Sequence, residues 1–270
     1  MEFSIVVPVC NEAGNVRPLL AEIAGAMAGQ PGMEVIYVDD GSTDDTSAEL
    51  RAAAPEHPWL RVLQHPRRYG QSTALLAGIE AARASWIITL DGDGQNDPAD
   101  IPVLIDRLAA ELERYAVVML AGHRTRREDN LVRRLSSGIA NAVRRRLLQD
   151  GTPDTGCGIK LFPRAEYLKL PAFDHMHRFL PALMQRQGVT VISVPVRHRA
   201  RGSGVSKYGV HNRLWVGLVD LAGVMWLQRR RLGGWRAPHG PLSRLGDSLG
   251  VAWLQHRPCR VTAQEESLHV

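Results

Sequence analysis

The chain has 270 residues, 44% of them hydrophobic, and this excludes a disordered polypeptide while allowing one large or two small globular domains. Its 33 Lys and Arg residues against 28 Asp and Glu residues give a net charge of +5, which suits ligands that carry phosphate, whether nucleic acid, anionic lipid or nucleotide. The three cysteines lack metal-binding spacing and cannot all pair, so we expect reduced thiols and a cytoplasmic protein.

The first elements in chain order alternate between strand and helix patterns. Short apolar runs rich in β-branched residues occupy 3–9, 34–38, 60–64, 86–90 and 116–121. Helical spacing fills the longer segments between the first four runs, where Asp44, Asp45 and Thr46 can cap a helix over 46–53. Asp97 and Pro98 can begin a further helix. The alternation predicts an α/β fold with a mostly parallel central sheet flanked by helices.

The second half of the chain is more basic. The sequence is basic and helical from Arg124 to Leu148, and another β-rich passage lies around 189–197. The apolar stretch 215–227 is shorter than the roughly 18–20 residues that span a bilayer, so we expect 213–231 to lie on an anionic membrane surface. Residues 232–270 lose periodicity and are expected to form a poorly ordered tail. The N-terminus reads as a strand rather than a signal peptide, which favours the cytoplasmic face of the membrane.

Polar residues follow three of the predicted parallel strands, where the carboxyl ends of the strands share one edge of the sheet. These residues are Pro8, Cys10, Asn11 and Glu12 after the first strand, Asp39 and Asp40 after the second, and Asp91, Asp93 and Gln95 after the fourth. Taken together they predict a nucleoside-diphosphate site. An ionised aspartate at 39 or 40 can accept hydrogen bonds from a base or ribose, although Asp-Asp-Gly-Ser is also typical of a turn and helix cap. A dinucleotide site is excluded because no G-x-G-x-x-G follows the first strand.

The pentapeptide 91–95 predicts a metal site. It places two carboxylates and an amide at alternate positions directly after a buried strand. Mg²⁺ and Mn²⁺ take oxygen ligands and are usually held by one or two carboxylates plus the phosphates of a substrate. We therefore predict that Asp91, Asp93 and Gln95 hold Mg²⁺ or Mn²⁺ together with a diphosphate.

These motifs together resemble the inverting family 2 glycosyltransferases of the GT-A fold, and more narrowly the dolichol-phosphate mannosyltransferases and bacterial polyprenyl-phosphate glycosyltransferases. The resemblance runs from about residue 3 to about residue 213 and implies a GT-A domain over 1–212. It implies a nucleotide site at the motifs of the first two strands, and a basic residue, Arg67 in the loop 65–74, near the nucleotide. The implied substrates are a nucleoside-diphosphate sugar and a polyprenyl phosphate, with no nucleic acid.

The resemblance also implies an acceptor-phosphate site built from basic and hydroxyl residues. Its members are Arg124, Arg133, Ser137, Asn141, Arg201, Ser206 and Lys207. Residues 133, 137 and 141 recur at four-residue intervals and would share one helix face, and the fork of arginine matches phosphate oxygens. The proposed catalytic residues are then Asp91, Asp93, Arg124 and Arg133.

The resemblance further implies that the stretch 154–160 is a loop beside the sugar, with Asp154, Gly158 and Lys160 as its site residues. We interpret Cys157 as a packing residue, because nothing nearby in sequence would lower the pKa of its thiol. The pair His175 and His177 is interpreted as packing plus a hydrogen bond rather than a metal site, since no third ligand is in view.

The predicted reaction is metal-dependent transfer of a sugar, from GDP-mannose or a UDP-sugar, to dolichol or undecaprenyl phosphate, with inversion. A phosphate acceptor is already anionic, so no strong general base is required. Two alternatives stay open. A transferase acting on a sugar hydroxyl would need a carboxylate base, for which Asp154 is the obvious candidate. A non-catalytic nucleotide-sugar-binding scaffold would not need a complete set of metal-binding carboxylates.

Overall fold

The computed structural model describes residues 2–28, 32–125, 144–199 and 210–230, which belong to one compact unit, Met1–Arg231. The predicted tail, 232–270, lies outside these described residues, so its order stays a prediction.

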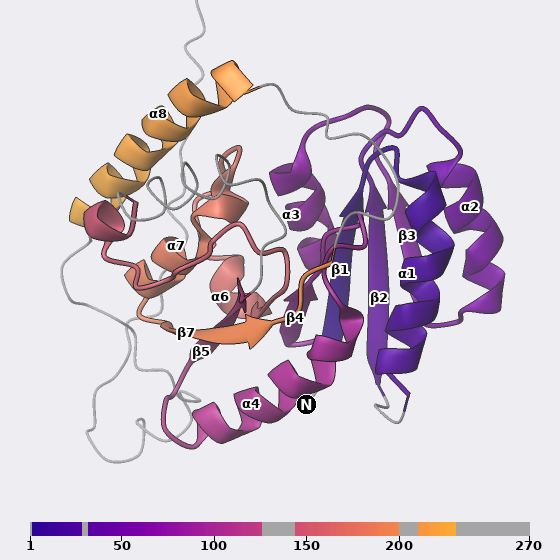
Figure 1. Ribbon diagram of the computed structural model, residues 1–270, viewed down its shortest axis with the longest axis horizontal. Helices are drawn as coiled ribbons and strands as arrows, with labels where there is room; N and C mark the ends of the chain where they lie inside the picture. The colour runs from indigo at the N-terminus through magenta and orange to yellow at the C-terminus, as the bar shows by residue number, and fades with distance from the viewer. Residues whose placement is uncertain (1, 29–31, 126–143, 200–209, 231–270) are drawn as a thin grey trace, which may run out of the picture. The chain divides into compact units, whose positions relative to one another are not determined.

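The described chain alternates strands and helices through its first half and mixes them after that (Figure 1). The strands are β1 Phe3–Val9, β2 Met33–Asp39, β3 Leu60–Gln64, β4 Trp86–Thr89, β5 Val118–Arg124, β6 Lys160–Pro163 and β7 Thr190–Val196. The α-helices are α1 Ala13–Ala26, α2 Thr46–Ala53, α3 Gln71–Ala81, α4 Ile101–Leu112, α6 Arg164–Tyr167, α7 Leu180–Arg186 and α8 Val210–Arg229. Short 3₁₀ turns are η1 Ala54–Glu56, η2 Pro98–Asp100 and η3 Met176–Arg178.

The strands form one mixed sheet in the order β3-β2-β1-β4-β6-β5-β7. The neighbours β3, β2, β1 and β4 are parallel, as are β5 and β7, and only β6 runs antiparallel to both its neighbours. The predicted mostly parallel sheet is therefore confirmed. Strand β6 was not predicted, because it has four residues and begins with a lysine.

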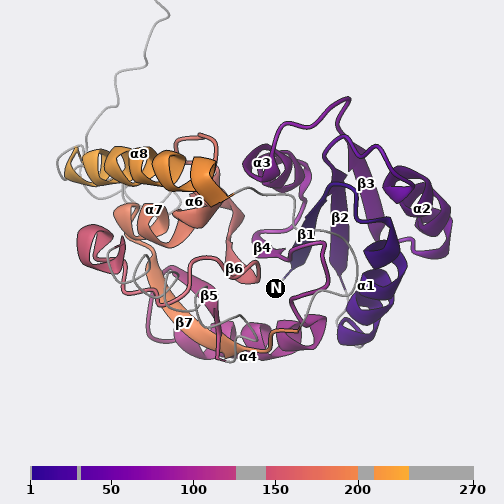
Figure 2. The same cartoon turned by 45° about the horizontal axis from the view of Figure 1, so that its top comes forward.

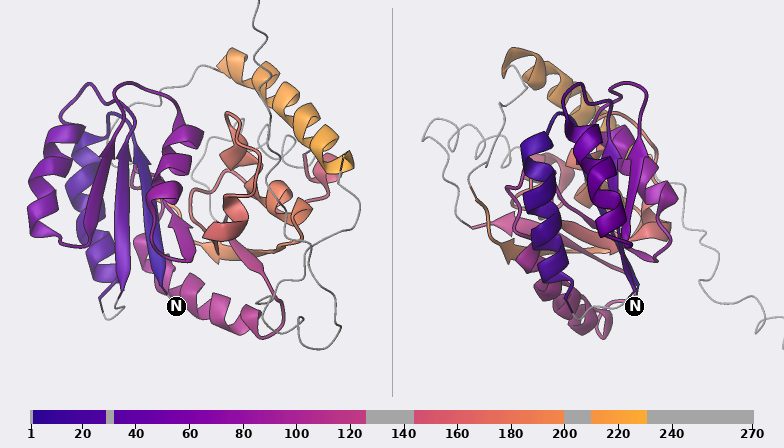
Figure 3. Two further views of the ribbon diagram at one scale, coloured as in Figure 1. Left: turned by 180° about the vertical axis from the view of Figure 1, so that it is seen from behind. Right: turned by 90° about the vertical axis from the view of Figure 1, so that its right-hand side faces the viewer.

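Helices cover both faces of the sheet, and alternate residues of each strand supply the two halves of the core. One face packs against apolar side chains of α1, α2 and α4, and the other against α3, α6, α7 and α8. Seen from two sides, α1 and α2 lie across the first strands from α3 (Figures 1 and 3). The core therefore consists of two apolar layers with the sheet between them.

Helix α8 is attached to the second of these layers, along the outside of α7 (Figure 2). Leu221 and Val224 are buried, and His175 Nδ1 lies 3.2 Å from a carboxylate oxygen of Asp220. Arg186 Nε of α7 donates to the carbonyl of Leu227 at 2.9 Å near the end of the helix. No helix in the part of the chain that the structure describes has the length and apolar character needed to cross a membrane.

The parallel register brings the predicted polar residues to one edge of the sheet. Val9 of β1 is paired with Asp39 of β2, and Val6 is paired with Thr89 of β4. The chain leaves all three strands in the same direction, so the segments that begin at residues 10, 40 and 90 emerge side by side. This edge carries the candidate site.

Candidate active site

A cavity of about 460 Å³ opens at this edge, between α3, the end of β4, the loop 155–158, β6 and η3. Its polar lining includes Gln71, Asp91, Gln95, Arg124, Lys160 and His177. Its apolar lining includes Leu75, Ile79, Phe162, Tyr167 and Leu180. The cavity therefore has a charged part at the ends of the strands and an apolar part between α3 and η3.

Asp91 stands at the charged part of this cavity. Its Oδ1 accepts a hydrogen bond from Gln71 Nε2 at 2.9 Å, and its backbone N–H donates to Asn96 Oδ1 at 3.3 Å. Burial and the neighbouring Asp93 carboxylate raise the pKa of Asp91 to about 6, against the opposing effect of nearby cations. Two neighbouring carboxylates repel each other, and a divalent cation bound by them would offset this repulsion.

The turn after Asp91 gathers further oxygen donors. Asp93 Oδ1 accepts from the backbone N–H of Gln95 at 3.2 Å, and Gly94 makes the turn with a φ of 72°. The residues that the structure describes contain no group of three or more His, Cys, Asp and Glu side chains able to hold a metal. Two carboxylates and an amide oxygen nevertheless fit Mg²⁺ or Mn²⁺, which keep waters or substrate phosphates as their remaining ligands.

The raised pKa of Asp91 predicts a pH-dependent metal affinity. Below about pH 6 the carboxyl is protonated and a cation must displace the proton, so we expect Mn²⁺ affinity to fall by up to about tenfold per pH unit there and to level off above pH 7. Without metal, the folded state holds this proton more tightly than the unfolded state, so the contribution of Asp91 to stability falls as pH rises from about 4 to about 6. Calorimetric titration with Mn²⁺ and UDP between pH 5 and 7.5 measures the affinity. Equal affinity at every pH would contradict the assignment.

Gly158 lies directly behind the Asp91 carboxylate. A Cβ on Gly158 would stand 2.2 Å from Asp91 Oδ2 and 2.6 Å from Asn96 Oδ1. The carbonyl of Gly158 accepts from Thr89 Oγ1 at 2.6 Å, which ties the loop to β4. Only glycine fits at this position, so Gly158 shapes the site through its backbone.

Two cations face Asp91 from β5 and β6. Arg124 binds Asp154 with both arms of its guanidinium, Nε to Oδ2 at 2.6 Å and Nη2 to Oδ1 at 2.9 Å, and Asp154 is 2% exposed. Lys160 is buried and donates from Nζ to the carbonyl of Cys157, and burial lowers the pKa of Lys160. Burial raises the pKa of the Cys157 thiol, which agrees with a packing role.

Asp39 and Asp40 are buried and bound to protein groups. Asp39 accepts from the Ser42 backbone N–H at 2.9 Å and from the Ser47 hydroxyl. Asp40 accepts from the N–H groups of Tyr69 and Gly70 at 2.9 and 2.7 Å, and lies 2.8 Å from His65 Nδ1. These contacts fix the loops that follow β2 and β3. Direct nucleotide binding by either carboxylate stays a prediction.

A second cavity, of about 600 Å³, lies beside these loops, lined by residues 41–43 and 64–68. The guanidinium of Arg67, in its lining, stacks 5.0 Å from the ring centroid of Tyr69. Asn11, with a φ of 52°, accepts on Oδ1 from the Thr43 N–H at 2.7 Å, and so joins the end of β1 to the loop after β2. Asn11 thus contacts the lining of this second cavity through Thr43.

The remaining residues of the first motif are Glu12, Pro8 and Cys10. The backbone N–H of Glu12 donates to Thr46 Oγ1 at 2.8 Å, and its Oε2 accepts from Asn15 Nδ2 at 2.7 Å. Pro8 and Cys10 are half-buried at the end of β1. Asp44, rather than the N-cap residue Asp45, accepts from the Thr46 N–H, at 3.0 Å.

Gln71 and His177 are cavity residues that the sequence analysis did not assign to the site, although it interpreted His177 as a packing residue with a hydrogen bond. His177 Nδ1 lies 2.7 Å from Ser72 Oγ, and burial lowers the pKa of His177 to about 3, so the imidazole is neutral. The signals were present, since Gln71 follows Gly70 in the donor-side loop and His177 lies in the His-Met-His-Arg-Phe motif. The contact between α3 and η3, which brings these two residues to one cavity, could not be predicted from the sequence.

Much of the predicted acceptor site lies outside the described residues. Those positions are Arg133, Ser137, Asn141, Arg201, Ser206 and Lys207. Of the predicted acceptor residues, the structure describes Arg124, at the end of β5 and in the cavity lining.

The model of glycosyl transferase family 2 matches residues 4–168. The chain belongs to this family. Its enzyme class is therefore glycosyltransferase. Among curated relatives, the dodecaprenyl-phosphate galacturonate synthase of Rhizobium johnstonii is 39% identical over 236 residues, which cover 85% of this chain and 68% of the relative. The undecaprenyl-phosphate 4-deoxy-4-formamido-L-arabinose transferase of Edwardsiella ictaluri is 36% identical, with 77% of this chain and 63% of the relative covered.

Solved glycosyltransferases share the fold. Glucosyl-3-phosphoglycerate synthase from Mycobacterium tuberculosis, solved with Mn²⁺, UDP-glucose and glycerol 3-phosphate, matches with a TM-score of 0.59 and 20% identity, covering 84% of this chain and 79% of that one. A mannosyltransferase from Pyrobaculum calidifontis, solved with GDP-mannose and Mn²⁺, also has a TM-score of 0.59 and 20% identity, covering 86% of this chain and 65% of that one. The fold is thus GT-A, as predicted.

Proposed function

We propose that this glycosyltransferase moves a sugar from a nucleoside-diphosphate sugar to a polyprenyl phosphate, with inversion at the anomeric carbon, in the synthesis of cell-envelope glycans or glycolipids. Both curated relatives carry a polyprenyl phosphate in their names, which supports this acceptor class. The name of the first relative contains galacturonate, so we include a UDP-linked uronic acid among the donors to be tested, beside GDP-mannose and neutral UDP-sugars.

The observation that carries the acceptor class is that the described part of the site holds no available carboxylate base. Asp91 is the only carboxylate among the described residues of the cavity lining, and it belongs to the proposed cation site. Asp154, the candidate base for a hydroxyl acceptor, has both oxygens bound by Arg124. An acceptor hydroxyl needs a base to remove its proton, whereas a phosphate is already a nucleophilic anion, so the geometry favours a phosphate.

The roles of the site residues follow from their charges. Asp91 and Asp93, with Gln95, would hold Mg²⁺ or Mn²⁺, which when bound offsets the charge that develops on the leaving diphosphate. Lys160 and Arg124 would place positive charge beside the reacting groups, where a buried site strengthens the attraction between a cation and a phosphate. Asp154 holds the guanidinium of Arg124 in one orientation. The proposal also includes binding of the acceptor phosphate by the residues at positions 133, 137, 141, 201, 206 and 207.

The proposal places the enzyme on the cytoplasmic face of an anionic membrane, with α8 at the lipid surface. Val219 and Trp226 of α8 are 68% and 59% exposed, seven residues apart and therefore on the same side of the helix. Arg229 and Arg230 follow them. Exposed apolar side chains next to basic ones are the pattern of a helix that lies in a membrane interface.

Replacing both Val219 and Trp226 by Asp is expected to reduce binding to phosphatidylglycerol vesicles at least about tenfold, because burial of each side chain is worth about 1.5–3 kcal/mol. Vesicle flotation measures the bound fraction. Val103→Asp is the matched control, since Val103 is 52% exposed on α4, on the opposite face of the sheet. Wild-type protein that stays off vesicles at every lipid charge would contradict the location.

A labelled-sugar transfer assay tests the reaction. Donors would include GDP-mannose, UDP-glucose and UDP-galacturonic acid, with undecaprenyl phosphate as acceptor and with or without a chelator of divalent cations. A labelled lipid that forms only without chelator supports the proposal and identifies the donor. Donor hydrolysis without lipid product would favour a hydroxyl acceptor, and nucleotide-sugar binding without any turnover would favour the scaffold.

A further inference from the structure

The segment that leaves β7 pairs with the loop that carries the proposed metal ligands, residues 91–96, which we call the carboxylate loop. Asn96 and His198 form an isolated antiparallel bridge. The N–H of Arg199 donates to the carbonyl of Gln95 at 3.0 Å, and Gln95 Nε2 lies 3.5 Å from the carbonyl of Arg199. The carboxylate loop is therefore held from outside by backbone that lies about 100 residues further along the chain.

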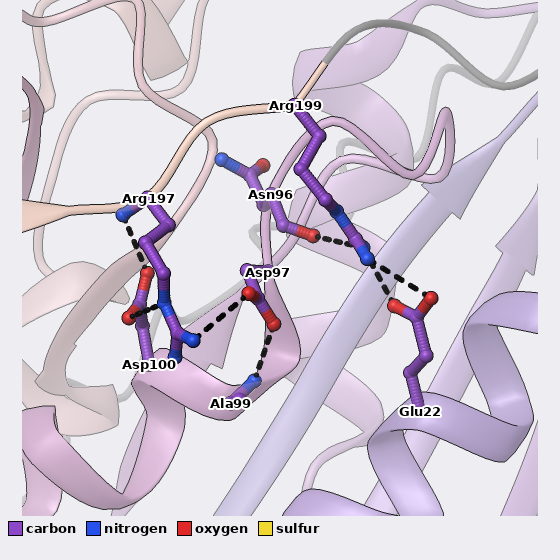
Figure 4. A network of polar contacts seen from close by, with 7 residues as sticks. All are labelled: Glu22, Asn96, Asp97, Ala99, Asp100, Arg197 and Arg199. Carbon is purple, nitrogen blue, oxygen red and sulfur yellow. Dashed lines mark hydrogen bonds and ion pairs between the residues drawn. The ribbon is translucent and has the colours of Figure 1, made fainter. Parts of the chain in front are cut away.

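The side chain of Arg199 connects this pairing to helix α1 (Figure 4). Its Nη1 and Nη2 bind the two carboxylate oxygens of Glu22 at 3.0 and 2.6 Å, and Nη2 also donates to the carbonyl of Asn96 at 3.2 Å. Asn96 in turn accepts the backbone N–H of Asp91 on its side chain. A continuous path of contacts thus runs from Glu22 through Arg199 and Asn96 to Asp91.

Arg197 holds the chain directly after the carboxylate loop (Figure 4). Its backbone N–H and its Nε donate to the two oxygens of Asp100 at 2.7 and 2.9 Å, and its Nη1 lies 3.3 Å from Asp97. Asp97 also accepts from the Ala99 N–H at 3.0 Å, at the start of η2. The carboxylate loop is therefore fixed beyond its end by Arg197 and within it by Arg199.

The pair of Arg199 and Glu22 is arranged for orientation more than for stability. The two side chains are 39% and 40% exposed, and ion pairs exposed to this degree contribute about 0–1 kcal/mol. The two parallel N–H···O bonds nevertheless fix the plane of the guanidinium, which a single contact would not do. Loss of this pair should therefore change the free energy of unfolding little, but it should change the position of the carboxylate loop.

We propose that Arg199, oriented by Glu22, is a positioning residue that holds Gln95 and Asn96 so that the carboxylate loop presents its oxygens to a divalent cation and a diphosphate. This inference rests on the proposed function, because it takes the loop to be the cation site. Groups that orient the ligands of a metal typically change its affinity by about 10–100-fold when they are removed.

The test compares Mn²⁺ binding by the wild-type chain and by its variants, each as the full chain in the presence of UDP. Electron paramagnetic resonance measures the concentration of free Mn²⁺. Arg199→Ala is expected to weaken Mn²⁺ binding about 10–100-fold. Glu22→Gln should weaken it less, because the bond from Arg199 to the Asn96 carbonyl remains. Arg17→Ala is the matched control, since Arg17 also lies on α1 and has an exposed ion pair, 3.7 Å from Glu56, away from the loop. Its Mn²⁺ affinity should equal that of the wild type.

The melting temperature without metal separates positioning from folding. We expect Arg199→Ala and Arg17→Ala to lower it by similar small amounts. Wild-type Mn²⁺ affinity in Arg199→Ala would overturn the positioning role alone, and so would a loss of affinity that only accompanies a large loss of melting temperature. Absence of Mn²⁺ binding by the wild type would overturn the proposed cation site, and this inference with it.

Discussion

Asp93→Asn is expected to reduce sugar transfer by about three orders of magnitude while the protein stays folded, a loss similar to that caused by removing a main electrostatic group from other active sites. Asparagine keeps the oxygen that accepts from the Gln95 N–H, so the turn survives, but it removes one of the two negative charges that attract the cation. The initial rate of labelled-lipid formation at saturating Mn²⁺ measures the effect.

The control for this variant is Asp106→Asn, which removes an exposed carboxylate from α4 and should leave the rate unchanged. The circular dichroism spectrum and melting temperature of Asp93→Asn should match those of the wild type. A fully active Asp93→Asn enzyme would contradict the proposed cation site.

Gly158→Ala is expected to reduce transfer by about 100-fold or more, because the added Cβ would stand 2.2 Å from Asp91 Oδ2 and the carboxylate must move. A displacement of about 1 Å near reacting groups can by itself cost about 100-fold in rate. Mn²⁺ affinity should fall together with the rate, since the same carboxylate serves both.

Gly156→Ala provides the comparison within the same loop. Its Cβ would lie 3.1 Å from Arg124 Nη2, the end of a long side chain, so we expect a rate within about tenfold of the wild type. Melting temperatures of both variants show whether the loop still folds. Equal activity of the two variants would show that the Asp91 carboxylate does not need the position that it has here.

The elements that are marked by a pattern among neighbouring residues were predicted from the sequence. β-branched runs predicted β1 to β5, and the residues after them predicted which edge of the sheet would be polar. The motif order predicted the family, which the match over residues 4–168 confirms. Such signals survive in the sequence because strand periodicity and strand-end motifs involve neighbouring residues.

The features that were missed depend on contacts between distant parts of the chain. Ser72 and His177, whose side chains lie 2.7 Å apart, are separated by 105 residues in the sequence, and Glu22 and Arg199 by 177 residues. Strand β6 was not predicted because it is short and carries Lys160, a residue type that is seldom buried and that here bonds to the Cys157 carbonyl and lies near Asp91. The turn interpretation of Asp-Asp-Gly-Ser agrees with the bond from the Ser42 N–H to Asp39, whereas the bonds from the distant N–H groups of Tyr69 and Gly70 to Asp40 could not be predicted from the sequence.

The central claim is that the acceptor is a lipid phosphate, and the direct measurement compares undecaprenyl phosphate with undecaprenol as acceptors under the same donor, Mn²⁺ and detergent. We predict labelled product with the phosphate and none with the alcohol, because the described residues of the cavity lining offer no available carboxylate to deprotonate a hydroxyl. Equal labelling of undecaprenol, or labelling of a glycan hydroxyl with none of undecaprenyl phosphate, would contradict the account.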